Sequence, residues 1–267
     1  MRKRKGRAME QQQQQQQPGW ARPLAVALTI LALCVASGLK SQDSAPGALR
    51  VLFVGNSLTD YNDLPAMVEA LAQAAGQKRT AFKAVVFGGF SLEDHWNQGD
   101  ARRAITRGKW DVVVLQQGPS ASTEGRKSLL EYTRRFSEEI RRAGARPALY
   151  MVWPSVGRAQ DFDGVAESYG QAAEASSGLL FPAGEAWRCA WRRAPDLEFY
   201  SADGLHPTVA GSYLAALIIY EGLYGQSPIG LPSTLELRSG ARIELPPAQA
   251  RLMQEAAAEA NKRFGRR

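Results

Sequence analysis

The stretch 51–59 reads Val-Leu-Phe-Val-Gly-Asn-Ser-Leu-Thr, and it gives the clearest indication of how this chain folds. Its opening run of apolar residues is typical of a strand buried on both faces. The Gly-x-Ser that follows indicates a tight turn, which places Ser57 at the carboxyl end of that strand. A serine held there can expose its hydroxyl as a nucleophile, although a turn or helix-capping serine is the simpler alternative.

The rest of the chain alternates short apolar runs with longer segments of helical periodicity. The spacing predicts strands over 50–54, 81–87, 110–115, 147–152 and 179–181. It predicts helices over 64–75, 92–107, 125–143, 162–176, 208–224 and 249–264. This alternation predicts a doubly wound α/β fold in three layers, with a mostly parallel five-stranded sheet and helices on both faces. Ligands of such folds bind beyond the carboxyl ends of the strands.

A second informative stretch, Asp-Gly-Leu-His-Pro over 203–207, lies just before the helix predicted to begin at residue 208. A histidine that has its own carboxylate is a suitable general base, and Asp203 stands three residues before His206. Each residue alone has a simpler explanation, because Asp-Gly is also a common turn. Together with Ser57, however, the two supply the parts of a serine nucleophile system, provided that both segments reach the same edge of the sheet.

These blocks resemble those of the SGNH (GDSL-type) hydrolases, an esterase family. In that family a serine follows the first strand in a Gly-Asp-Ser-Leu block, and an Asp-x-x-His block lies near the C-terminus. The blocks 55–58 and 203–206 match these two, with Asn56 where the family has aspartate. Gly89, or its neighbour Gly88, matches the glycine that the family carries after the second strand. The resemblance therefore implies an SGNH, flavodoxin-like fold.

The resemblance covers roughly residues 50–225 and departs at the third block, where the family has an asparagine. Here the segment 115–120 reads Leu-Gln-Gln-Gly-Pro-Ser. Gapless matching puts Gly118 near the place of that asparagine. Gln117 or Gln116 can supply the same side-chain amide on a longer arm instead, and Gln117 is slightly preferred. This departure makes the third block the least secure part of the predicted site.

The resemblance implies ester hydrolysis through an acyl-enzyme. Ser57 would attack the carbonyl, His206 would act as the base, and Asp203 would orient His206. The backbone N–H groups of Ser57 and Gly89 and the amide of Gln117 would stabilise the oxyanion. No cofactor and no metal site are expected.

Three residues are candidates for lining the substrate cleft: Asn56, His95 and Trp153. His95 follows the glycine block and is otherwise an ordinary helix residue with a hydrogen bond. Trp153 follows the fourth predicted strand and is otherwise a packing residue.

Three functions remain open from the sequence. The first is an esterase for a small acyl ester, such as an acetyl group on a carbohydrate. The second is a lipase or thioesterase that uses the same three residues. The third is a binding protein that keeps the fold without the chemistry, and the altered third block is its support.

The net charge of +7 on 267 residues belongs mainly to the two ends of the chain. Residues 1–22 carry +5 and residues 262–267 carry +4, which leaves about −2 between them. This distribution argues against a nucleic-acid groove. The chain has two cysteines, Cys34 and Cys189. An intramolecular disulfide is not expected, because Cys34 lies in the apolar segment 23–39, which has the pattern of a secretory signal.

The N-terminal region predicts export. Residues 1–22 are basic and contain a glutamine tract, and residues 23–39 are apolar and end in small residues, as in a secretory signal. An uncleaved membrane anchor over 23–39 is the alternative, whereas Leu33 before Cys34 disfavours lipidation. The true start is Met1 or Met9. We expect a linker over 40–48, the hydrolase domain over 49–230 and a C-terminal extension with a helix over 231–267.

Overall fold

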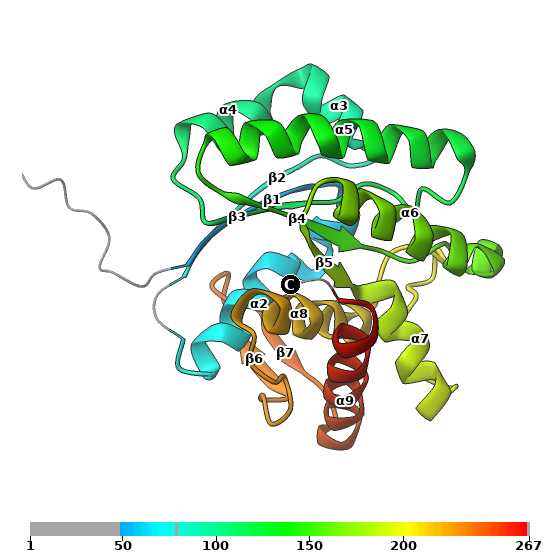
Figure 1. Cartoon of the computed structure of the whole chain (residues 1–267). Helices are drawn as coiled ribbons and strands as arrows, with labels where there is room; N and C mark the ends of the chain where they lie inside the picture. Colours follow the sequence, from blue (N-terminus) through cyan, green and yellow to red (C-terminus); the bar gives the residue numbers. More distant parts are fainter. Residues whose placement is uncertain (1–48, 78–79, 266–267) are drawn as a thin grey trace, which may run out of the picture. The chain divides into compact units, whose positions relative to one another are not determined.

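The computed structural model describes residues 49–77 and 80–265, so the segments 1–22, 23–39 and 40–48 lie outside the described residues. A five-stranded, fully parallel sheet forms the middle layer (Figure 1). Its strands are β1 (Arg50–Gly55), β2 (Ala81–Val86), β3 (Val112–Leu115), β4 (Arg146–Met151) and β5 (Leu179–Pro182). Their order is β2-β1-β3-β4-β5. The sheet predicted from the sequence is thereby confirmed.

Helices cover both faces of this sheet (Figure 1). One layer holds α3 (Leu92–Gln98), α4 (Asp100–Arg107), α5 (Thr123–Arg142) and α6 (Phe162–Ala175). The other holds α2 (Leu64–Ala74), α7 (Ala183–Arg193), α8 (Val209–Tyr224) and α9 (Pro247–Phe264). Three short helical segments, α1 (Ser57–Asp60), η1 (Tyr61–Asp63) and η2 (Val156–Asp161), follow the ends of strands. The three-layer architecture is therefore as predicted.

The strand order reverses at β1, which lies between β2 and β3. Val54 near the end of β1 pairs with Val85 on one side and with Leu115 on the other. The chain leaves β1 toward one edge of the sheet and later crosses back to build the other edge. A crevice opens where such a reversal occurs, beyond the carboxyl ends of the strands. Ser57 and Gln116 lie there, because each comes within two residues of the end of its strand.

Burial explains why the apolar runs become strands and why α8 forms. Residues 51–54 are at most 1% exposed, since helices cover both faces of β1. Helix α8 is apolar almost all round and is buried over 210–221, because it lies between the sheet and the neighbouring helices α2, α7 and α9. A helix that is hydrophobic on every side is stable only in such a position.

Three elements differ from the sequence expectations. The helix predicted over 92–107 is two helices, because Gly99 adopts φ 84° and ends α3. Helix α7 was not predicted; it begins directly after β5, with Pro182 at its N-cap and no side chain capping it. An antiparallel hairpin of β6 (Thr234–Glu236) and β7 (Arg242–Glu244) was also not predicted.

The C-terminal extension belongs to the same compact unit as the sheet. Helix α9 packs against α7 and α8, and its Asn261 donates from Nδ2 to the carbonyl of Ile218 (3.0 Å) and to Glu221 (2.9 Å). Residues beyond 230 therefore complete the hydrophobic core, and the expected boundary at 230 is not a boundary of the fold. Within the described ranges, no helix has the length and apolar character needed to cross a membrane.

Candidate active site

The turn after β1 presents Ser57 at the first position of α1. Asn56 is the N-cap of this short helix, and its Oδ1 accepts from the N–H of Leu58 at 3.1 Å. Its Nδ2 donates to the carbonyl of Phe90 at 2.9 Å, which joins the turn to the loop after β2. Asn56 therefore caps this helix, a role for which the aspartate of the family pattern is also suited.

Gln116, directly after β3, holds this turn in place. Its Oε1 accepts from the N–H of Asn56 (2.9 Å) and from the hydroxyl of Thr59 (2.7 Å). Its Nε2 donates to Asn56 Oδ1 (2.9 Å) and to the carbonyl of Gln117 (2.7 Å). The side chain is fully buried, so these bonds satisfy an amide that would otherwise be costly to bury. Gln116 thereby fixes the nucleophile turn against the neighbouring strand.

The loop 203–207 is folded around Asp203. One carboxylate oxygen, Oδ1, accepts from the N–H groups of Leu205 and His206, both at 2.9 Å. Gly204 between them adopts φ 70°, a conformation that favours glycine. The indole N–H of Trp153 donates to the carbonyl of Leu205 at 3.0 Å. The loop is therefore held by hydrogen bonds within itself and by one from Trp153, just after β4.

Ser57, His206 and Asp203 form one hydrogen-bonded series. The distance between Ser57 Oγ and His206 Nε2 is 2.8 Å, and the distance between His206 Nδ1 and Asp203 Oδ2 is 2.5 Å. A carboxylate accepts only, so Nδ1 carries the proton and Nε2 is left to accept from the serine hydroxyl. The hydrogen bond from His206, helped by the two backbone N–H groups, lowers the pKa of Asp203 to about 2. The arrangement can therefore remove a proton from Ser57.

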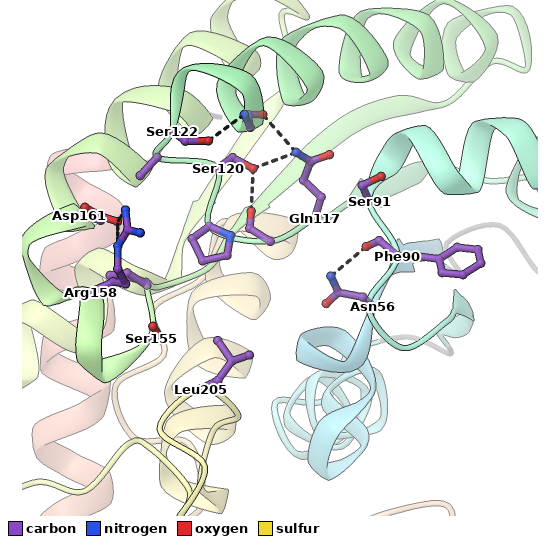
Figure 2. Close-up of a pocket in the computed structure, with 16 residues that line it drawn as sticks. Asn56, Phe90, Ser91, Gln117, Ser120, Ser122, Ser155, Arg158, Asp161 and Leu205 are labelled. Carbon is purple, nitrogen blue, oxygen red and sulfur yellow. Dashed lines mark hydrogen bonds and ion pairs between the residues drawn. The ribbon is translucent and has the colours of Figure 1, made fainter.

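Figure 2 shows residues that line a cavity of about 540 Å³. Its lining includes Gly89 and also Asn56 and Leu205, which are the neighbours of Ser57 and His206 in the chain. Its other walls carry four serines and an ion pair: Ser91, Ser120, Ser122, Ser155, and Arg158 with Asp161. Phe90, Pro119, Ala121, Pro154 and Leu205 also line it, so the cavity combines polar and apolar walls.

Two residues predicted to line the cleft do not do so. Trp153 is fully buried and stacks on Trp187, with their ring centroids 3.6 Å apart. His95 is 1% exposed, and its Nε2 lies 2.8 Å from the carbonyl oxygen of Gly55. Both predictions are therefore wrong, because both side chains point into the core. Trp153 supports the histidine loop and His95 supports the end of β1.

Gln117 lines the cavity, but its amide is used elsewhere. Its Nε2 donates to Ser120 Oγ (2.8 Å) and to the carbonyl of Gly125 (3.3 Å), and its Oε1 accepts from the N–H of Leu92 (3.1 Å). Figure 2 shows this amide directed toward Ser120 rather than toward Asn56. The side chain therefore has no N–H group left for an oxyanion, contrary to the prediction. Both N–H groups of the Gln116 amide are used as well.

Two residues of the site were missed in the sequence. The ring of Tyr61 stacks on the ring of His206, and Asn62 donates to the carbonyl of Pro207. A signal was available, since Tyr61 stands four residues after Ser57 and thus about one helical turn away. In the described part of the chain, no cluster of three or more His, Cys, Asp or Glu side chains could hold a metal ion.

Comparison with known proteins was made at the levels of sequence and structure. No family model and no curated protein sequence matches the chain. Among solved structures, a protein from Slackia heliotrinireducens assigned to the SGNH hydrolases is 31% identical. The alignment covers 66% of this chain and 99% of that one, with a TM-score of 0.55.

Two further structures share the fold at lower identity. A lipase/acylhydrolase from Enterococcus faecalis is 18% identical, with 66% of this chain and 96% of that chain covered and a TM-score of 0.55. A variant of an acetyl xylan esterase from Geobacillus stearothermophilus is 16% identical, with 67% and 96% covered and a TM-score of 0.53. With the 31% identical relative matched over nearly its whole length, the chain belongs to the SGNH hydrolase family and is a serine hydrolase of the type that acts on ester bonds.

Proposed function

We propose that the chain hydrolyses a small acyl ester with Ser57 as nucleophile, His206 as general base and Asp203 as the group that orients His206. The observation that carries this proposal is the series of hydrogen bonds from Ser57 Oγ to His206 Nε2 and from His206 Nδ1 to Asp203 Oδ2, at 2.8 and 2.5 Å. These are the contacts that a serine nucleophile needs before substrate binds.

In the first step, Ser57 Oγ forms a bond to the ester carbonyl carbon while its proton passes to His206 Nε2. The resulting imidazolium is stabilised by Asp203, and it returns the proton to the leaving alcohol as the ester C–O bond breaks. In the second step, water attacks the acyl-serine, its proton passes to His206, and the acid and Ser57 are released. The two steps consume one ester and one water and yield one acid and one alcohol.

The backbone N–H groups of Ser57 and Gly89 are the donors that we assign to the oxyanion. Ser57 is the first residue of α1, where an N–H has no partner within the helix. Gly89 lines the cavity in the loop after β2, and in the described ranges its N–H has no backbone partner. Donors of this kind typically contribute about a hundred- to a thousandfold in rate each.

The cavity walls combine apolar groups with serine hydroxyls and a charge-compensated Arg158–Asp161 pair. Such a lining suits a small neutral ester that has a polar part. The acetyl xylan esterase among the structures that share the fold supports an acetylated carbohydrate. A lipase or thioesterase activity is the second candidate, and the lipase/acylhydrolase neighbour is the observation in its favour.

The test is labelling and turnover in the purified chain. A serine-directed fluorophosphonate should label the wild type and not Ser57→Ala, whereas Ser155→Ala, which removes another hydroxyl of the cavity, should label normally. Among p-nitrophenyl acetate, butyrate and octanoate, kcat/KM should be highest for acetate, and an acetylated oligosaccharide should release acetate. Folded wild-type protein that is neither labelled nor active would instead indicate a binding protein. A preference for octanoate would indicate the lipase.

We also propose that the chain is exported through residues 23–39, on the strength of their apolar sequence after a basic start. Expression of the full chain followed by N-terminal sequencing of the mature product tests this. A new N-terminus near residues 37–39 in the exported fraction is the expected result, an intact N-terminus in the membrane fraction indicates an anchor, and retention in the cytosol contradicts export.

A further inference from the structure

Tyr61 and Asn62, immediately after the nucleophile helix, contact the histidine loop. The ring centroids of Tyr61 and His206 are 4.6 Å apart, with 23° between the ring planes. Asn62 Nδ2 donates to the carbonyl of Pro207 (3.1 Å) and to Ser212 Oγ (2.9 Å). The two residues therefore connect the segment that carries Ser57 to the segment that carries His206.

Packing in the core does not account for Tyr61. Its side chain is one of the large apolar side chains of the described residues that remain well exposed, at 40%. The face that it does cover is that of His206, whose side chain is 22% exposed. An aromatic ring placed on a partly exposed imidazole instead of in the hydrophobic interior indicates a function in the site.

The backbone of Asn62 is in the left-handed region, with φ 56° and ψ 21°. This conformation is unfavourable for residues other than glycine, although asparagine tolerates it better than most. Asp63 is left-handed too, but its side chain caps α2, which gives it a local reason. Asn62 caps no helix, and both of its donor bonds go to the histidine side of the site. A strained residue whose side chain reaches such a partner is a candidate for a functional role.

The hydrogen bonds of His206 act on Nδ1 and Nε2, which lie at the edge of the ring. The Tyr61 ring packs on its face and so restrains the imidazole in a direction in which the two hydrogen bonds do not act. The same aromatic face also attracts the positive imidazolium that forms when His206 takes the proton from Ser57.

We infer that Tyr61 and Asn62 are positioning residues that hold the His206 ring in line with Ser57 for proton transfer. This inference rests on the proposed function, since it assigns a role within the same Ser57–His206 reaction. Tyr61 acts on the ring, and Asn62 acts on the backbone of the loop next to it.

The first test uses Tyr61→Leu and Tyr61→Phe in the full chain. The leucine variant loses the aromatic face, so kcat for p-nitrophenyl acetate and the rate of fluorophosphonate labelling should both fall about tenfold, or about 1.4 kcal/mol. KM should stay within about twofold of the wild-type value, and the phenylalanine variant should restore both rates because it keeps the ring. Ile229→Ala, which truncates an exposed apolar side chain between α8 and β6, is the control for nonspecific surface effects.

The second test separates the effect of the Asn62 side-chain hydrogen bonds from the effect of its backbone conformation. Asn62→Gly suits the left-handed backbone, so the midpoint of thermal unfolding should not fall by more than a few degrees, whereas the labelling rate should fall about tenfold. Asn62→Asp, which has no N–H to give Pro207, should lose rate in the same way.

The outcomes distinguish this inference from the proposed function. If the wild type is labelled at Ser57 but Tyr61→Leu and Asn62→Gly are labelled at the wild-type rate, the inference is wrong and the proposed function stands. A rise in KM at unchanged kcat and labelling rate would make Tyr61 a substrate contact and would also overturn the inference. If the wild type itself is not labelled, both the inference and the proposed function are wrong.

Discussion

Gly55 and Gln116 fit together so closely that position 55 has no room for a side chain. A Cβ atom there would come within 3.0 Å of both the Gln116 amide oxygen and the Thr59 hydroxyl. Both of these oxygens belong to the hydrogen bonds that hold the nucleophile turn. The glycine of the first sequence block is therefore required by a close approach between strands β1 and β3.

Gly55→Ala should damage stability and activity together. The added methyl group must displace the buried Gln116 amide, and overpacking of this kind costs about 1–3 kcal/mol in unfolding free energy. The labelling rate of Ser57 should fall by at least about tenfold, since the turn would shift. Urea unfolding and fluorophosphonate kinetics measure the two effects. Gly170→Ala on α6, where a Cβ meets no atom within 4 Å, is the matched control and should be neutral or slightly stabilising.

Gln117→Ala should behave as a structural change rather than as the loss of an oxyanion donor. It breaks the bonds to Leu92, Ser120 and Gly125, so the unfolding free energy should fall by about 1–3 kcal/mol. The kcat of the folded variant should fall by much less than the roughly hundredfold expected for a lost oxyanion donor. A hundredfold loss of kcat at wild-type stability would return Gln117 to the role that the sequence suggested.

His95 should make the folded state sensitive to mild acid. Burial is the main cause that lowers its pKa, against the hydrogen bond to Gly55 and the charges of Asp94 and Asp100, which raise it. As pH falls below about 6.5, the unfolded chain takes up a proton at His95 more readily than the folded chain does. The free energy of unfolding therefore falls, by up to about 1.4 kcal/mol per pH unit. Urea unfolding at pH 7.5 and 5.5 should show a larger decrease in this free energy for wild type than for His95→Gln, and equal decreases would contradict the prediction.

Asp203→Asn should abolish most activity at neutral pH. An asparagine amide facing Nδ1 favours the tautomer with a proton on Nε2, which cannot accept the Ser57 proton; the loss expected from serine proteases is roughly 10³- to 10⁴-fold in kcat. The expected control result is a retained fold, because an asparagine Oδ1 can still accept from Leu205 and His206.

The same variant should reveal a stability difference that depends on pH. The pKa of Asp203 is lowered to about 2, mainly by the hydrogen bond from His206. Its carboxylate therefore stabilises the folded state above the unfolded pKa of about 3.9, and this contribution is lost as pH falls toward about 2. The difference in unfolding free energy between wild type and Asp203→Asn should shrink between pH 4 and pH 2. A difference that stays constant over this range would mean that Asp203 is not held as an anion by the fold.

The sheet was predictable because its strands are short and largely apolar, although β2 contains Lys83. Helix α7 was not, since it begins without a capping side chain directly after β5. The break at Gly99 was missed because α3 and α4 together continue one helical pattern.

For the site, the sequence predicted which residues lie near the ends of strands, but not the direction in which their side chains point. Ser57 could be placed at the carboxyl edge because it directly follows a predicted strand, whereas Asp203 and His206 were expected there because their loop before a helix could reach that edge and because the family resemblance pairs them with the serine. Trp153 also follows a strand, but whether its ring turns toward the cavity or toward Trp187 depends on tertiary packing. Tyr61 reaches His206 through a segment that includes the left-handed backbone of Asn62, which no pattern of apolar residues indicates.

Ser57 and His206 are 149 positions apart in the sequence, and this separation has a consequence during synthesis of the polypeptide. A chain emerging from the ribosome exposes Ser57 long before His206 has been synthesised, although all five strands of the parallel sheet precede His206 in the sequence. The proposed hydrolysis therefore cannot begin when the strands of the sheet are complete. A fragment that ends before Asp203 should contain every strand of that sheet and yet have no activity.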